Sequence, residues 1–142
     1  MKILLAVDGF KNSLSAVDSV IEHADWYRDK PAVELVTVHL PLPKLPRMGL
    51  VVGKNQIQRY YEEEGEACLA AAKKKLDAAG IAYKASVLVG PVAETLVQHA
   101  QKARCDLIFI GTHGRTAVGN AMLGSTATKV LHISKTPVLL VR

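Results

Sequence analysis

The chain has 142 residues, of which 49% are hydrophobic and 22% charged, a balance that excludes a protein disordered along most of its length. We predict a single domain over residues 1–142, large enough to bury a core without metal or disulfide support. The formal net charge is +5, but the basic residues are scattered along the chain and interleaved with acidic ones. Two Phe, one Trp and four Tyr also offer little surface for stacking bases. We therefore expect no nucleic-acid partner.

Five short apolar runs along the chain predict buried strands. They cover residues 3–7, 33–40, 83–89, 107–110 and 137–141. Several are apolar at consecutive positions, which is typical of parallel strands covered by helices on both faces.

The segments between these runs repeat apolar residues every three or four positions, which indicates helices. The expected helices are one capped by Asn12 or Ser13, one over residues 56–79, one opening at Gly90-Pro91 and one starting near Ser125. In the last helix we expect Ala127, Val130 and Leu131 to face the core.

The alternation of strands and helices predicts a doubly wound α/β domain. We expect three layers in a Rossmann-like arrangement, with a five-stranded parallel sheet in the order 3-2-1-4-5. Residues 41–55 are irregular and too long for an ordinary connection. They include four apolar residues between Met48 and Val52, so this segment is either a lid, a partner contact or a mobile loop.

The compartment is expected to be the cytoplasm. The apolar opening run stops at Asp8, short of a signal peptide, and no stretch reaches the roughly 18 apolar residues needed to span a membrane. Cys68 and Cys105 have neither CxxC nor metal-ligand spacing, so we predict that both are reduced and buried.

Ligands of doubly wound sheets bind beyond the carboxyl ends of the strands. One such end is followed by Gly111 and Gly114, where we expect the backbone to turn through positive φ and to approach a ligand closely. Gly124-Ser125 then begins a helix whose free N–H groups suit a phosphate chain. The Ser125 hydroxyl would add hydrogen bonds, and Arg115 or Lys11 would add positive charge.

These glycines and Ser125 form the pattern G-x2-G-x9-G-S, which is more specific than an isolated glycine pair. It lies within "CDLIFIGTHGRTAVGNAMLGSTATKVL", and the chain also contains "ILLAVDGFKNS", "VELVTVHL" and "TPVLLVR". On these segments the chain resembles the universal stress protein family over nearly its whole length, and within it the single-domain, UspA-like, ATP-binding type.

The resemblance implies that ATP binds with Mg²⁺ or Mn²⁺ at its phosphates. The adenosine pocket would be lined by Ala6, Val7, Asp8, Leu40 and Ile110, with Asp8 bonded to the ribose hydroxyls. The phosphates would be surrounded by Gly111, His113, Gly114, Arg115, Gly124, Ser125, Thr126 and Ala127. Phe10 stands where relatives commonly have Ser, and its ring would alter the pocket mouth.

The resemblance also implies a homodimer formed through the final strand, residues 137–142, whose short apolar edge favours pairing. We predict a nucleotide-dependent regulator of the stress response and not an enzyme. No catalytic residue is assigned, because Asp8 is needed for the ribose and His113 has no evident orienting partner, so ATP hydrolysis would be slow at most.

Two alternatives remain open at this point. One is a dimeric interaction module that binds no nucleotide. The other is a metal-dependent hydrolase, in which Asp8, His39 and His113 would hold zinc, although none of them has a second ligand at close spacing. The remaining histidines, His23, His99 and His132, are expected to be surface or cap residues of the helices. A P-loop is excluded because GxxxxGK[ST] is missing, and no GxGxxG follows the first strand.

Overall fold

The computed structural model describes residues 1–42, 53–112 and 123–142. In chain order the elements are β1 (Lys2–Ala6), α1 (Lys11–Glu22), the short 3-10 helix η1 (Ala24–Trp26), β2 (Ala32–His39), α2 (Lys54–Ala78), β3 (Tyr83–Val89), α3 (Val92–Lys102), β4 (Leu107–Gly111), α4 (Ser125–Ile133) and β5 (Val138–Val141). Every predicted strand is present, with its ends shifted by one residue at most. None of the helices in these ranges has both the length and the apolar character that crossing a membrane requires.

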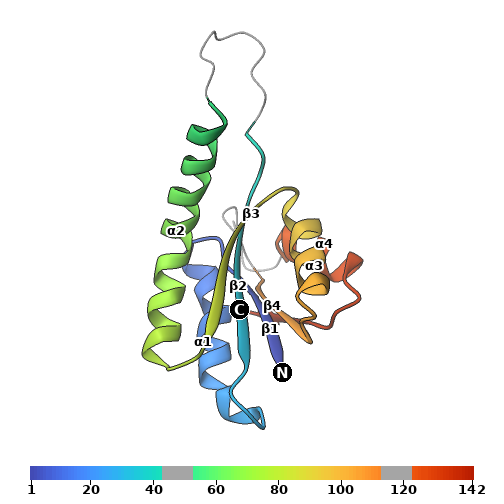
Figure 1. Ribbon diagram of the computed structural model, residues 1–142. Helices are drawn as coiled ribbons and strands as arrows, with labels where there is room; N and C mark the ends of the chain where they lie inside the picture. Colours follow the sequence, from blue (N-terminus) through green and yellow to red (C-terminus); the bar gives the residue numbers. More distant parts are fainter. Residues whose placement is uncertain (43–52, 113–122) are drawn as a thin grey trace.

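The five strands form one parallel sheet in the order β3-β2-β1-β4-β5, which confirms the predicted fold. Helices α1 and α2 cover one face of the sheet, and α3 and α4 cover the other (Figure 1). Successive residues of a strand point to opposite faces. In β1, Leu5 therefore packs on the α1 and α2 side, and Leu4 packs on the side of α3 and α4. Burial on both faces explains why this strand is an unbroken apolar run.

The strand order reverses between β1 and β4. The chain passes from β1 outward through β2 to β3, and then returns to place β4 on the opposite side of β1. Ala6 near the carboxyl end of β1 pairs with Val36 of β2 and with Ile110 of β4. The carboxyl ends of these three strands thus lie at one level, where a doubly wound sheet opens a crevice for ligands.

Close packing of α2 against the sheet depends on one glycine. A Cβ atom at Gly65 would lie 2.4 Å from both γ-methyl carbons of Val87 in β3. No real Cβ approaches a neighbour so closely, so the missing side chain is what lets the middle of α2 reach β3.

Two details of the predicted helices are wrong. Helix α1 begins at Lys11 and its N-cap position is held by Phe10 in an extended conformation, without a side-chain cap. The predicted cap residues Asn12 and Ser13 lie inside the helix, and the Ser13 hydroxyl donates back to the Phe10 carbonyl oxygen at 2.9 Å. In α4, Leu131 is 43% exposed, because only the side of this short helix that carries Ala127 and Val130 meets the core.

A charged cluster lies near the amino ends of β1 and β2. Glu34, only 6% exposed, contacts Lys2 with a distance of 3.2 Å between Oε1 and Nζ, and its other carboxylate oxygen is 3.3 Å from Nε2 of His99. His99 was predicted at the surface, but its side chain turns towards β2 to meet this carboxylate. Burial alone would raise the pKa of Glu34, but the hydrogen bonds and charges of Lys2 and His99 outweigh it and lower that pKa below its usual value.

Candidate functional site

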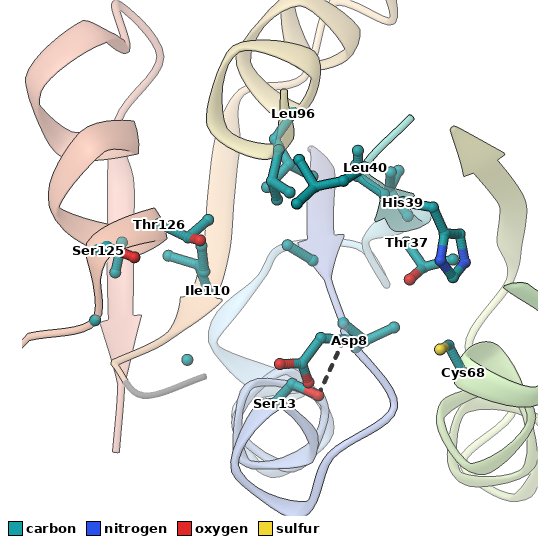
Figure 2. A pocket seen from close by; sticks show the side chains of 18 of the residues that line it. Asp8, Ser13, Thr37, His39, Leu40, Cys68, Leu96, Ile110, Ser125 and Thr126 are labelled. Carbon is teal, nitrogen blue, oxygen red and sulfur yellow. Dashed lines mark hydrogen bonds between the residues drawn. The ribbon is translucent and has the colours of Figure 1, made fainter. Parts of the chain in front are cut away.

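A cavity of about 560 Å³ opens at the carboxyl ends of β1, β2 and β4 (Figure 2). All the predicted site residues that fall in the described ranges line it, and they are Ala6, Val7, Asp8, Leu40, Ile110, Gly111, Gly124, Ser125, Thr126 and Ala127. The other three, His113, Gly114 and Arg115, lie outside the described residues, as do residues 43–52 of the irregular segment. Segments far apart in the sequence therefore converge on one cavity, as the strand ends predicted.

One side of the cavity is formed by the beginning of α4. Gly124 occupies the N-cap position, and its N–H donates to the Thr112 carbonyl oxygen at 2.8 Å. Across the ranges that the structure covers, no acceptor meets the N–H groups of Ser125, Thr126 and Ala127. These donors and the Ser125 and Thr126 hydroxyls give this side of the cavity the character of an anion site.

Asp8 is held in place by its own turn. Its Oδ1 accepts the Phe10 N–H at 3.1 Å, and its N–H donates to the Ser13 hydroxyl at 3.2 Å, the bond drawn in Figure 2. Gly9 between them has a φ of +80°, and a Cβ there would lie 3.0 Å from the Cα atom of Cys68 in α2. The turn therefore requires glycine for both its conformation and its contact with α2. The second carboxylate oxygen of Asp8 has no partner among the described residues.

Phe10 is not among the described residues that line the cavity, so the effect predicted for its ring stays a prediction. Its bond to Asp8 comes from the backbone N–H, which any residue except proline would supply. Lys11, predicted as a source of positive charge, is exposed and does not line the cavity either.

Gly111 lines the cavity, but the positive φ predicted for it is wrong. Its φ is not positive; among described glycines only Gly9, Gly80 and Gly90 have positive φ. A Cβ at Gly111 would lie 2.9 Å from the Asn12 carbonyl oxygen of α1. Glycine is required here because β4 and α1 approach each other closely.

Sequence reasoning missed the side of the cavity that α2 provides. Tyr60, Tyr61 and Cys68 line it from this helix, together with His39 and Leu42 at the end of β2. Tyr61 and Cys68 are seven positions apart, which places them on one face of a helix, but the sequence alone does not say which element that face meets. Cys68 is half-buried, not buried as predicted.

The other cysteine behaves as predicted. Cys105 is buried, and burial raises the pKa of its thiol to about 11, so it is an unreactive small apolar residue.

The predicted zinc ligands are only partly brought together. Asp8 and His39 both line the cavity, whereas His113 lies outside the described residues. No group of three His, Cys, Asp or Glu side chains able to hold a metal ion occurs in residues 1–42, 53–112 and 123–142. The Nε2 atom of His39 is buried without a hydrogen-bond partner in this part of the chain.

The cavity is polar at one side and apolar at the other. In Figure 2, Ser125 and Thr126 stand on one side, His39 and Cys68 stand on the other, and Asp8 and Leu40 lie between them at the bottom and top of the view. Leu40 and Leu42 after β2 and Tyr60 of α2 are exposed apolar residues of the lining. Such a site fits an elongated ligand with an anionic end and a flat, apolar end.

The chain is similar in sequence to known proteins. A sequence model of the universal stress protein family matches residues 1–142. Universal stress protein MJ0531 of Methanocaldococcus jannaschii is 32% identical over 142 residues, covering 99% of this chain and 81% of the relative. Universal stress protein YxiE of Bacillus subtilis is 28% identical, covering 99% and 98% of the two chains.

Two solved structures have the same fold. The structure of protein MJ0577 superposes with a TM-score of 0.79 at 27% identity, covering 99% of this chain and 94% of the other. A universal stress protein in complex with cAMP superposes with a TM-score of 0.67 at 26% identity, covering 100% and 96%.

Proposed function

The chain belongs to the universal stress protein family, and from this premise we propose that it binds ATP in the cavity and acts as a nucleotide-dependent regulator of the stress response. The observation that carries the proposal is the order of chemical character along the cavity: anion donors at α4, the Asp8 carboxylate between, and apolar side chains at the end of β2 and on α2. Phosphates, ribose and base follow one another in the same order in a nucleotide.

Each part of the nucleotide has a partner of suitable chemistry. The N–H groups of Ser125, Thr126 and Ala127 meet phosphate oxygens, supported by the positive end of the helix dipole. The second oxygen of Asp8 accepts a ribose hydroxyl. Leu40 covers one face of the base. A cavity of about 560 Å³ is of ordinary size for a cofactor site.

The relative solved in complex with cAMP supports an adenine nucleotide as the ligand. cAMP shares adenine, ribose and a phosphate with ATP, so the same polarity of site serves both. ATP in place of a monophosphate is our proposal, based on the several donors at the start of α4.

A divalent cation fits this site when it arrives with the phosphates. Mg²⁺ prefers oxygen ligands and keeps several of its waters, so it needs few protein ligands. The hydroxyl oxygens of Ser125 and Thr126 are suitable ligands for Mg²⁺, and the ion would neutralise phosphate charge there.

We propose that the protein is not an enzyme. Of the carboxylate and imidazole groups in the described wall of the cavity, Asp8 is bonded to its own turn, and His39 stands at the side opposite α4 (Figure 2). Neither is placed to activate a water beside the phosphates, so hydrolysis is slow at most.

We further propose a cytoplasmic homodimer paired through β5.

An interaction module without nucleotide is the second candidate. A ring that blocked the pocket mouth would favour this candidate, but Phe10 is not among the described residues that line the cavity. The metal-dependent hydrolase draws no support from the described part of the chain, which holds no three-ligand group.

Isothermal titration of the purified protein with ATP in the presence of Mg²⁺ tests the proposal. We expect saturable binding, weakened about tenfold by Asp8→Ala through loss of a hydrogen bond to a charged group. Phe10→Ser is the matched control and should bind as the unaltered chain does. If the unaltered protein shows no binding at millimolar ATP, the regulator proposal is wrong and the interaction module replaces it.

A further inference from the structure

The apolar side of the cavity ends in a short segment that leaves β2, residues 40–42, which we call the rim. Leu40 is 66% exposed and Leu42 is 45% exposed, and both line the cavity. Such apolar side chains at a cavity mouth can contribute to binding only if the backbone that carries them is held in one position.

One side chain of α2 holds the rim. The Leu42 N–H donates to the Tyr61 hydroxyl oxygen at 2.6 Å, and Tyr61 is itself only 7% exposed. The Tyr61 ring lies next to the His39 ring, with centroids 6.1 Å apart. On the other side of the segment, the His39 carbonyl oxygen accepts the Gly90 N–H at 2.9 Å.

The same face of α2 also supports the Asp8 turn. Cys68, two helical turns after Tyr61, is the residue against which Gly9 packs. Between them, Gly65 brings α2 onto β3. One rigid helix therefore sets the distance between the rim and the carboxylate that we assign to the ribose.

We infer that Tyr61 is a positioning residue for the purine base, acting through its hydroxyl on the rim. The inference rests on the proposed nucleotide site and names the part of the chain that determines how tightly its base is held. Without the hydroxyl, the Leu42 N–H loses its acceptor and the rim must be ordered anew each time a nucleotide binds. Tyr61 need not touch the nucleotide for this effect.

The test is Tyr61→Phe, which keeps the ring and removes only the hydroxyl. Tyr83→Phe is the control, because it removes a hydroxyl that donates to Asp77 at 3.3 Å and Tyr83 does not line the cavity. We expect the Kd for Mg-ATP to rise about five- to tenfold in Tyr61→Phe and to stay within twofold in Tyr83→Phe. Thermal melting checks that both variants fold.

Hydrogen exchange of the Leu42 amide in the nucleotide-free protein separates positioning from general loosening. In Tyr61→Phe this amide should exchange at least about tenfold faster, while amides of α3 keep their rates. Unchanged ATP affinity in Tyr61→Phe overturns the inference, and so does weaker binding without faster exchange at Leu42. Absence of ATP binding by the unaltered chain is a different result, since it overturns the proposed function and this inference with it.

Discussion

Glu34 illustrates at the scale of one residue how a buried charge is accommodated. Its carboxylate lies under α3, and Lys2 and His99 each meet one of its oxygens. Lys2 is further held by the Ala103 carbonyl oxygen at 3.1 Å, and its backbone N–H donates to Asp106 at 2.7 Å. These contacts tie the start of β1 to β2 and to the connection between α3 and β4.

The lowered pKa of Glu34 makes stability depend on pH. A carboxyl with a lower pKa in the folded than in the unfolded chain stabilises the fold above its unfolded pKa of about 4.3. That contribution is lost as the pH falls through the folded pKa. We predict that Glu34→Gln lowers the free energy of unfolding by about 1–3 kcal/mol at pH 7, and that the difference shrinks below about pH 4.

Urea unfolding of both chains at pH 7, 5 and 3.5 measures this difference. Glu66→Gln is the control, because Glu66 pairs with Lys73 on the exposed surface of α2, where an ion pair contributes little. A gap between Glu34→Gln and the unaltered chain that stays constant with pH would show that the carboxylate charge is not what stabilises this site.

At the scale of elements, α2 is a polar helix that packs on the sheet through a narrow buried stripe. This stripe includes Leu69 and Leu76 and the small residues Gly65 and Ala72. Gly65 is unfavourable for an isolated helix, and the closeness of Val87 explains why it is present.

We predict that Gly65→Ala lowers the free energy of unfolding by about 1–3 kcal/mol, because the added methyl group would overlap Val87. This outcome is opposite to the gain that Ala normally brings inside a helix. Adding Val87→Ala should recover part of the loss, since it removes the methyl groups in the way. A double-mutant cycle of chemical unfolding measures the coupling, and zero coupling would mean that α2 does not pack as described.

The elements were predictable from the sequence wherever a local pattern determined them. Apolar runs located every strand, and the helix predicted over residues 56–79 ends within one residue of the end of α2. The pattern could not identify the cap of α1, because Ser13 carries a hydroxyl suited to an N-cap but uses it within the helix. Nor could it find Tyr61 in the cavity wall, since that placement depends on how α2 lies across the sheet. Gly111 shows the same limit. The sequence correctly placed it at the ligand cavity, but its close contact with α1 could not be predicted from the sequence.

At the scale of the whole molecule, the strand order decides where function can lie. The reversal next to β1 gathers residues from both halves of the chain into one cavity. The alternation of strands and helices predicted that ligands bind at the carboxyl ends of the strands. The same order leaves β5 at an edge, where β4 is its one neighbour among the described strands. An edge strand offers its free backbone groups to a second chain.

The register of β5 identifies the groups that would pair. The carbonyl oxygens of Pro137 and Val141 accept N–H groups of Ile108 and Thr112 at the β4 side. Backbone groups alternate in direction along a strand, so the N–H and C=O of Leu140 point to the open edge. In the proposed homodimer this edge meets its copy across a two-fold axis.

Leu140→Pro removes one of these outward N–H groups while leaving the bonds to β4 in place, since proline is tolerated at a strand edge. We predict that it shifts the protein from dimer to monomer, whereas Leu140→Val, which keeps the N–H, remains dimeric. Light scattering coupled to size-exclusion chromatography at equal protein concentrations gives the mass of each, and circular dichroism checks the fold. A Leu140→Pro variant that folds and keeps the dimer mass would place the interface elsewhere. If the unaltered chain is monomeric, the homodimer is removed from the proposal. The nucleotide site would remain, because every described residue lining the cavity comes from a single chain.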